Sequence, residues 1–246
     1  MEAEKEEKFI LMTYRSGINK AIPSTYYESD SGWGCMLRVG QMAIANLLHF
    51  HDKVAMKVIL ELFWDNSDEP FSIQQFTAAT LKMYPHKKPF EWYNPCEMSF
   101  LIKDLLEREC HNMHVKVFPD NSLFLSEIPK THSKLLVIIL IRIGLEEPEE
   151  IYLPVIDSLM NNRFFFAALG GTPKHAHLFL KSKKGQIGYL DPHKVLKAAS
   201  SEEDLLAREA EYWSSLSWLK ATKIDSSMAM IFRLEKEEVE EYWKSL

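Results

Sequence analysis

Hydrophobic residues recur at two different spacings along the chain, and the change of spacing divides it into two halves. In the first half, helical spacing follows Cys35 and recurs over 53–63, over 72–83 and from Pro95 through Leu106. In the second half, apolar runs rich in β-branched and aromatic residues predict strands at 135–143, 164–169, 177–181, 186–190 and 228–234. Stretches 150–160 and 202–213 look helical, and Pro154 in the first of these predicts a kink or a late start. This order of elements predicts an α+β fold, with helices packed on a largely antiparallel sheet.

The segment SDSGWGCMLRVGQM, residues 29–42, places a cysteine where a helix begins. Ser29 to Gly32 are turn and capping residues, and from Cys35 onward the apolar positions follow helical spacing. The first N–H groups of a helix have no partner within the helix, and its dipole is positive at that end. Both features favour a thiolate over a thiol, so the sequence predicts a reactive thiol at Cys35.

The tripeptide Asp191-Pro192-His193 offers a general base together with a group that orients it. Pro192 has no N–H and disfavours a helical Asp191, so we expect an extended segment with Asp191 and His193 on the same side. The carboxylate can then accept a hydrogen bond from one imidazole nitrogen and leave the other to take the proton of the thiol.

Four motifs occur in one order along the chain. They are GWGCMLR-x-GQM around Cys35, WY-x-P at 92–95, GG-x-P-x-x-AH at 170–177 and YLDPH at 189–193. Together they resemble the autophagin family, the papain-like cysteine peptidases that process the ubiquitin-like modifier of autophagy, and the resemblance runs from about Thr13 to about Phe232. It implies a papain-like fold in which the nucleophile helix packs against a sheet that carries Asp191 and His193.

The resemblance also implies residue roles. Cys35 matches the family nucleophile, and Asp191 and His193 match the other members of the triad. Tyr14 matches the tyrosine whose hydroxyl helps to form the oxyanion hole, where the N–H of Cys35 is the second donor.

Two further residues match the walls of the substrate groove. Trp92 matches the tryptophan that clamps the glycine of the substrate tail, and Pro173 matches the loop that covers the groove until substrate lifts it. The chain departs from the family pattern at Val39, where a small residue is common, and at Leu178, where an aromatic residue is common. It is also shorter than is usual in the family. None of these differences touches the triad.

The reaction that the resemblance implies is peptide hydrolysis after a C-terminal glycine of the modifier. It would serve both to trim the precursor and to release the modifier from phosphatidylethanolamine. The expected partners are therefore the free precursor and the lipid-conjugated form. We expect a monomer that needs no metal or other cofactor.

Composition and charge argue against several classes of protein. The formal net charge is −6 and the basic residues are scattered, which argues against a nucleic-acid surface. The longest apolar run, 135–141, is too short to cross a bilayer, so any membrane contact would be peripheral, through the lipidated substrate. The acidic N-terminus does not resemble a signal peptide, and three cysteines, Cys35, Cys96 and Cys110, do not suggest a disulfide framework. These features predict a cytoplasmic enzyme.

The last ten residues carry a separate signal. Four glutamates within 237–241 precede Tyr242 to Leu246, and Trp243 with Leu246 resembles the aromatic-x-x-aliphatic peptides that dock onto the autophagy modifier. The simpler interpretation is an acidic terminal helix that packs Trp243 and Leu246 against the domain. We therefore expect a single peptidase domain over 1–236 and an acidic tail over 237–246.

Three other functions remain open at this point. His175, His177, Asp191 and His193 can be arranged as a zinc site of a metal-dependent hydrolase, which would leave Cys35 unexplained. The peptidases of the ubiquitin-fold modifier also carry GWGC and Asp-Pro-His, but the cysteine is followed there by Ala-Tyr-Arg rather than by Met36-Leu37-Arg38. The third possibility is a homologue that holds the modifier without cutting it, against which the intact triad argues.

Overall fold

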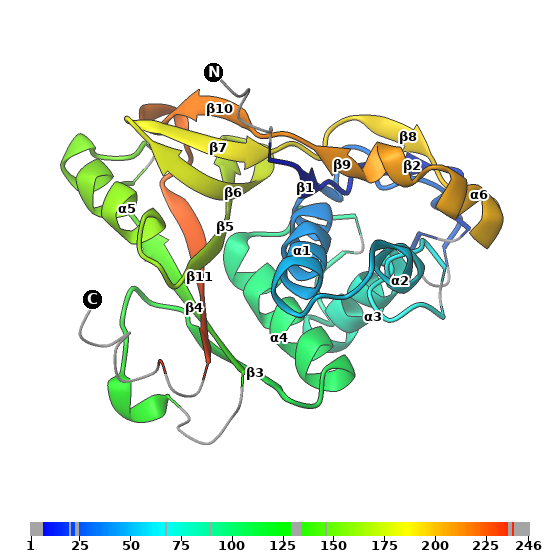
Figure 1. Ribbon diagram of the computed structural model, residues 1–246, viewed down its shortest axis with the longest axis horizontal. Coiled ribbons are helices and arrows are strands. Elements are labelled where there is room, and N and C mark those ends of the chain that lie inside the picture. Colours follow the sequence, from blue (N-terminus) through cyan, green and yellow to red (C-terminus); the bar gives the residue numbers. More distant parts are fainter. Residues whose placement is uncertain are drawn as a thin grey trace.

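A seven-stranded sheet forms the centre of the part of the chain that the computed structural model describes, which is residues 7–19, 21–22, 25–66, 68–88, 90–128, 134–145, 147–235 and 238 (Figure 1). The strands lie in the order β10-β7-β6-β5-β11-β4-β3. Neighbours are antiparallel except β3 and β4, which are parallel. Their bounds are β3 Met113–Phe118, β4 Lys134–Arg142, β5 Phe165–Thr172, β6 His175–Lys183, β7 Gln186–Leu190, β10 Ser217–Lys220 and β11 Ser227–Glu235. The prediction of an α+β fold with a largely antiparallel sheet is confirmed.

Helices cover both faces of this sheet. Helices α1 (Cys35–Asn46) and α4 (Pro95–Glu109) pack on one face, and α5 (Leu153–Met160) packs on the other (Figure 1). Alternate residues of β4 therefore belong to two separate hydrophobic clusters, Leu136 and Ile138 on the α1 side and Val137 on the α5 side. Because both faces are buried, the strand is apolar at successive positions rather than at every second one.

Two helix starts have the side-chain caps that the sequence suggests. Helix α3 starts after Ser72, whose hydroxyl accepts from the N–H of Gln75, and α4 starts with the predicted capping box of Asn94 and Glu97. The other α-helices are α2 Met56–Leu62 and α6 Glu202–Ala207; η1 Leu47–His51 is a π-helix that continues α1, and the 3₁₀ turns are η2 Leu125–Glu127, η3 Glu150–Tyr152, η4 Glu209–Tyr212 and η5 Ala221–Lys223.

Two short strand pairs lie beside the sheet and were not predicted. Strand β1 (Phe9–Ile10) pairs with β9 (Trp213–Ser214), and β2 (Tyr14–Ser16) pairs in parallel with β8 (Val195–Lys197). The paired residues, such as Phe9 with Ser214 and Tyr14 with Val195, are far apart in the sequence, so no local pattern predicts them. The second pair brings Tyr14 next to the loop that carries His193.

Two differences from the predicted elements have local causes. The predicted helix over 202–213 ends at Ala207 and continues as a 3₁₀ turn, because Trp213 is drawn into β9. In the 150–160 stretch Pro154 lies in the first turn of α5, so the late start is the correct alternative. No helix among the described residues is long and apolar enough to span a membrane.

Candidate active site

Cys35 is the first residue of a helix that is buried on every side. All residues of α1 from Cys35 to Asn46 are buried, so the helix is central rather than amphipathic. The N-cap residue is Gly34, and no side chain caps the helix there. Its first N–H groups are therefore left for other partners. This arrangement holds the thiol in place and keeps hydrogen-bond donors near it.

An ion-pair network fixes the turn that precedes Cys35. The guanidinium of Arg38, only 2% exposed, donates to Asp30 Oδ2 at 2.6 Å and to both carboxylate oxygens of Asp65 at 3.0 and 3.1 Å. The other oxygen of Asp30 accepts from the N–H of Arg15 at 2.7 Å, and the Asp30 carbonyl accepts from the N–H of Gly34. Asp30 thereby joins the start of α1 to the strand that carries Tyr14. The sequence predicts only a turn at Asp30, so this role could not be foreseen.

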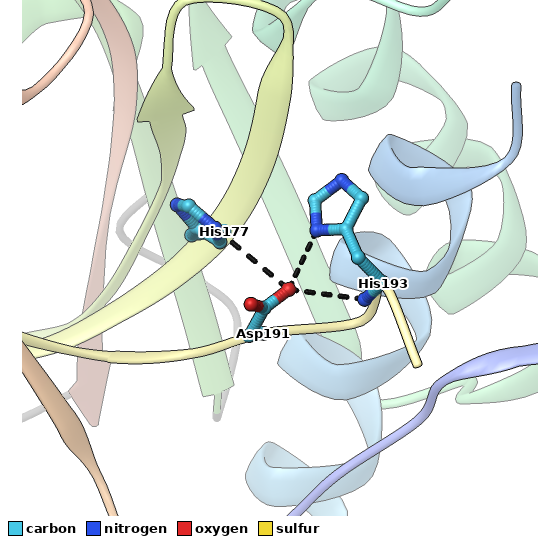
Figure 2. Close-up of side chains that lie close together, drawn as sticks. All are labelled: His177, Asp191 and His193. Atoms are coloured by element: carbon cyan, nitrogen blue, oxygen red, sulfur yellow. Dashed lines mark hydrogen bonds and ion pairs between the residues drawn. The ribbon is translucent and has the colours of Figure 1, made fainter. Parts of the chain in front are cut away.

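Asp191 and His193 form the expected pair. Nδ1 of His193 lies 2.5 Å from Asp191 Oδ1, and the N–H of His193 donates to the same oxygen at 3.0 Å (Figure 2). The intervening Pro192 accepts at its carbonyl from the N–H of Tyr14 at 2.9 Å. The hydrogen bond at Nδ1 leaves Nε2 as the ring nitrogen that can take a proton from a nucleophile.

The thiol of Cys35 interacts with three groups that favour its ionised form. Burial alone raises the pKa of Cys35, but hydrogen bonding with the His193 ring, with the N–H of Ala176 and with the Tyr14 hydroxyl outweighs burial, and the pKa is lowered. The N–H of Ala176, on β6, is a contact that sequence analysis missed, because a backbone donor has no residue signature.

His193 and Asp191 are shifted in the matching directions. The hydrogen bond to Asp191 and the interaction with Cys35 raise the pKa of His193 to about 9. The hydrogen bond from His193 lowers the pKa of Asp191 to about 2. The lowered pKa of Cys35 and the raised pKa of His193 both favour a thiolate beside an imidazolium.

Tyr14 lies where its hydroxyl can interact with the thiol of Cys35. The side chain is buried, its hydroxyl interacts with Cys35, and its ring meets the His193 ring edge-on with centroids 5.5 Å apart. Burial, followed by the charge of Cys35, raises the pKa of Tyr14 well above its usual range. The hydroxyl therefore stays protonated and remains a hydrogen-bond donor.

The β5–β6 hairpin forms one wall of the site. Gly170 and Gly171 are needed there: a Cβ at Gly170 would lie 2.5 Å from the Phe179 ring, and one at Gly171 would lie 2.0 Å from the His175 carbonyl oxygen. Pro173 lies at the exposed turn of this hairpin. The loop expected to cover the groove is therefore a tight two-residue turn.

A cavity of about 250 Å³ opens at Cys35 between this hairpin and Trp92. Trp92 is 52% exposed, and its Nε1 donates to the Gly32 carbonyl at 2.8 Å, which holds the indole beside the turn before α1. Thr172 and Lys174, on either side of Pro173, line the cavity, whereas Pro173 does not. The other lining residues are Met36, Tyr93, Asn94, Pro95, Gly170, Gly171, His175, Ala176, Asp225 and Ser227.

A second cavity, of about 390 Å³, continues from the first. The two share Asn94, Pro95 and Ser227, and the second runs past Cys96 to the end of β4 at Arg142.

The atoms considered for zinc do lie near one another. One atom each of His177, Asp191 and His193 falls within 4.8 Å of the others. Two ligands of a tetrahedral zinc ion stand roughly 3.3 Å apart, however, whereas the Nδ1 of His193 and the Oδ1 of Asp191 are 2.5 Å apart. His175 is exposed, and its Nδ1 lies 3.2 Å from the Pro173 carbonyl oxygen. As they stand, these groups fit a hydrogen-bonded pair and not a ligand set.

The structure thus brings Cys35, Asp191, His193, Tyr14 and Trp92 to one place, with Pro173 at its edge. Trp243 and Leu246 lie outside the described residues, so the tail prediction stays a prediction.

Comparison with known proteins agrees with this geometry. The family model of the peptidase C54 catalytic domain matches residues 2–245. The chain belongs to the peptidase C54 family. The predicted membership in the autophagin family is therefore confirmed, and with it the enzyme class, cysteine protease.

Several C54 relatives carry this activity in their names. The chain is 30% identical over 232 residues to the probable cysteine protease atg4 of Schizosaccharomyces pombe, covering 93% of this chain and 71% of that protein. It is 27% identical over 269 residues to the cysteine protease ATG4A of Xenopus laevis, covering 89% and 67% respectively. It spans only 54% of the probable cysteine protease ATG4 of Chaetomium globosum, at 27% identity over 90% of this chain.

Proposed function

We propose that this chain is a cysteine endopeptidase that cleaves after the C-terminal glycine of the ubiquitin-like autophagy modifier. The observation that carries the proposal is the pairing of His193 with Asp191 through Nδ1, beside a buried Cys35 whose pKa is lowered at an uncapped helix start. Family membership supplies the substrate class. It also favours this function over processing of the ubiquitin-fold modifier.

The proposed reaction follows from these positions. The Cys35 thiolate attacks the glycine carbonyl, and the oxyanion accepts hydrogen bonds from the Tyr14 hydroxyl and from the N–H of Cys35. The His193 imidazolium gives its proton to the leaving amine as the C–N bond breaks, and Asp191 keeps the ring oriented. Water then attacks the thioester, with His193 as the base, and the free carboxylate leaves Cys35.

The shape of the groove supports a glycine at the scissile bond. The cavity at Cys35 lies between the indole of Trp92 and the β5–β6 hairpin. A residue without a side chain passes such a gap more easily than any other. We propose that Trp92 clamps the glycine and that the Pro173 turn moves aside when the tail enters.

One mechanism serves both proposed substrates. The bond to the next residue of the precursor and the bond to the amine of phosphatidylethanolamine are both amides of the same glycine. The chain therefore needs no second site for release from lipid. No metal or other cofactor takes part in the proposed steps.

The direct test is cleavage of a tagged precursor of the autophagy modifier, followed on a gel, with wild type and Cys35→Ala compared. We expect cleavage after the glycine by wild type alone. Binding of the precursor by both proteins without cleavage by either would replace the proposal with a non-catalytic binder. If neither protein bound or cut it, the modifier would be the wrong substrate, and the ubiquitin-fold modifier would be tested next.

The remaining features of the proposal concern the whole chain. We propose a monomer with one peptidase domain over 1–236 that works in the cytoplasm, consistent with three free cysteines. The tail over 237–246 is proposed to dock the modifier through Trp243 and Leu246. Truncation after Glu241 would then weaken binding of the modifier in a titration, and unchanged affinity would remove the tail from the proposal.

A further inference from the structure

A second histidine approaches the triad carboxylate from the sheet. His177, on β6, is 6% exposed, and its Nε2 lies 3.8 Å from the Asp191 Oδ1 that also pairs with His193 (Figure 2). The Nδ1 of His177 is buried and has no hydrogen-bond partner among the described residues. A buried nitrogen without a partner costs free energy, so Nδ1 contributes no polar contact that would explain a histidine here. The nitrogen that faces a polar group is Nε2, on the side of Asp191.

The surroundings of His177 keep its ring neutral. Burial lowers the pKa of His177 to about 4, and the neighbouring titratable groups are Asp191, His193 and His175. The ring also packs against Tyr189 with centroids 4.5 Å apart. A neutral ring has one N–H, and the nearby carboxylate favours its placement on Nε2.

Asp191 needs an anchor outside its own loop. Its side chain is 48% exposed, and its other hydrogen bonds come from the ring and the N–H of His193, two residues away. Those bonds fix the carboxylate relative to His193 but do not fix the pair relative to the sheet. His177 is the contact that joins the carboxylate to β6, the strand whose Ala176 N–H reaches Cys35. At 3.8 Å the contact is longer than a hydrogen bond, and we expect it to shorten when substrate binds, as catalytic hydrogen bonds often do.

We infer that His177 is a positioning residue: its Nε2–H holds the Asp191 carboxylate in the orientation that keeps His193 over Cys35. The inference rests on the proposed function for its purpose. Its tests, however, need no modifier and can fail independently of that function. It differs from a packing role because it requires a donor at Nε2.

The first test uses the unmodified protein. Long-range ¹H–¹⁵N spectra of the histidine rings, with His177 assigned by its absence in His177→Gln, report the tautomer and the titration of each ring. We expect a neutral His177 with its proton on Nε2 at pH 7, and no protonation until well below pH 6. A proton on Nδ1, or a charged ring at pH 7, would overturn the inference.

The second test measures thiolate reactivity. The alkylation rate of Cys35 by iodoacetamide is followed by mass of the Cys35 peptide across pH in wild type, His177→Gln and His177→Phe. Gln keeps a donor near Nε2, whereas Phe keeps the ring without one. In wild type the alkylation rate should change near pH 9, where His193 loses its proton; we call this change the alkaline limb. In His177→Phe we expect the alkaline limb to move to a pH roughly one unit lower, about the effect of a lost hydrogen bond to a charged group. We expect His177→Gln to recover most of this shift.

The outcomes separate the alternatives. A His177→Phe protein that loses thermal stability but keeps the wild-type limb has lost only packing, and the inference fails. An alkaline limb that moves to higher pH would mean that His177 competes with His193 for Asp191, and this result also contradicts the inference. Expected shifts without modifier cleavage by wild type would sustain this inference while removing the proposed substrate.

Discussion

Two cysteines in this chain occupy nearly the same place in a helix, yet they differ in chemistry. Cys35 is the first residue of α1 and Cys96 is the second residue of α4. The pKa of Cys35 is lowered, whereas burial and then the charge of Glu97 raise the pKa of Cys96. A helix N-terminus alone therefore does not make a reactive thiol.

The difference lies in what surrounds each helix start. At α4 the side chains of Asn94 and Glu97 already occupy N–H groups, and Glu97 adds a negative charge. At α1 Gly34 provides no side-chain cap, and His193, Ala176 and Tyr14 converge on the sulfur instead. The local sequence provides the helix, and distant strands provide the chemistry. The predictions below remove the nucleophile first and then groups that distant segments bring to it.

The largest effect is expected from removing the nucleophile itself. Cys35→Ala should lower kcat/KM for precursor cleavage by at least about a thousand-fold, because no other group can form the thioester. Cys96→Ala is the matched control and should stay within about twofold of wild type. Comparable losses in both variants would mean that the helix start, not the partners, determines function.

Removing His193 should make Cys35 resemble Cys96. His193→Ala takes away the strongest group that lowers the pKa of Cys35 and also the acid for the leaving group, so kcat/KM should fall by roughly a thousand-fold or more. Asp191→Asn should cost roughly a hundred-fold or more, because the ring loses its orienting acceptor. Steady-state kinetics, with Tm measured on the same variants, check both predictions. Near-normal turnover in a folded Asp191→Asn would exclude Asp191 from the triad.

Tyr14→Phe should have a smaller effect on the same reaction. Loss of one oxyanion donor typically lowers kcat by about a hundred-fold, and KM should change little. Tyr84→Phe, at the end of α3, controls for loss of a hydroxyl elsewhere. If Tyr14→Phe raised KM without lowering kcat, the hydroxyl would bind substrate rather than stabilise the transition state.

Trp92→Ala should give the smallest of these losses, about ten-fold in kcat/KM, because positioning of the glycine is impaired while the triad stays intact. Tm should hardly change, since Trp92 is half exposed. Trp218→Ala, another exposed tryptophan on β10, is the control. Wild-type turnover in the Trp92 variant would count against the clamp.

Some of these features can be predicted from the sequence and others cannot, for physical reasons. The start of α1, the capping box at Asn94 and the pairing of Asp191 with His193 depend on neighbouring residues, and the structure has them as predicted. The contacts of Arg38 with Asp30 and Asp65, by contrast, join distant segments, and a buried arginine looks in the sequence like any surface arginine. The Ala176 N–H is a backbone group and carries no signature at all.

The central claim is that partners, not the helix end, ionise Cys35, and competitive alkylation tests it most directly. Wild type and His193→Ala are treated with limiting iodoacetamide from pH 5 to 10, and modification of the Cys35 and Cys96 peptides is read from the same digest. In wild type we expect Cys35 to react far faster than Cys96 at pH 6.5. Its rate should fall only below its lowered pKa and change again as His193 loses its proton near pH 9. In His193→Ala the two cysteines should converge. A Cys35 that keeps its lead at pH 6.5 without His193 would contradict the account.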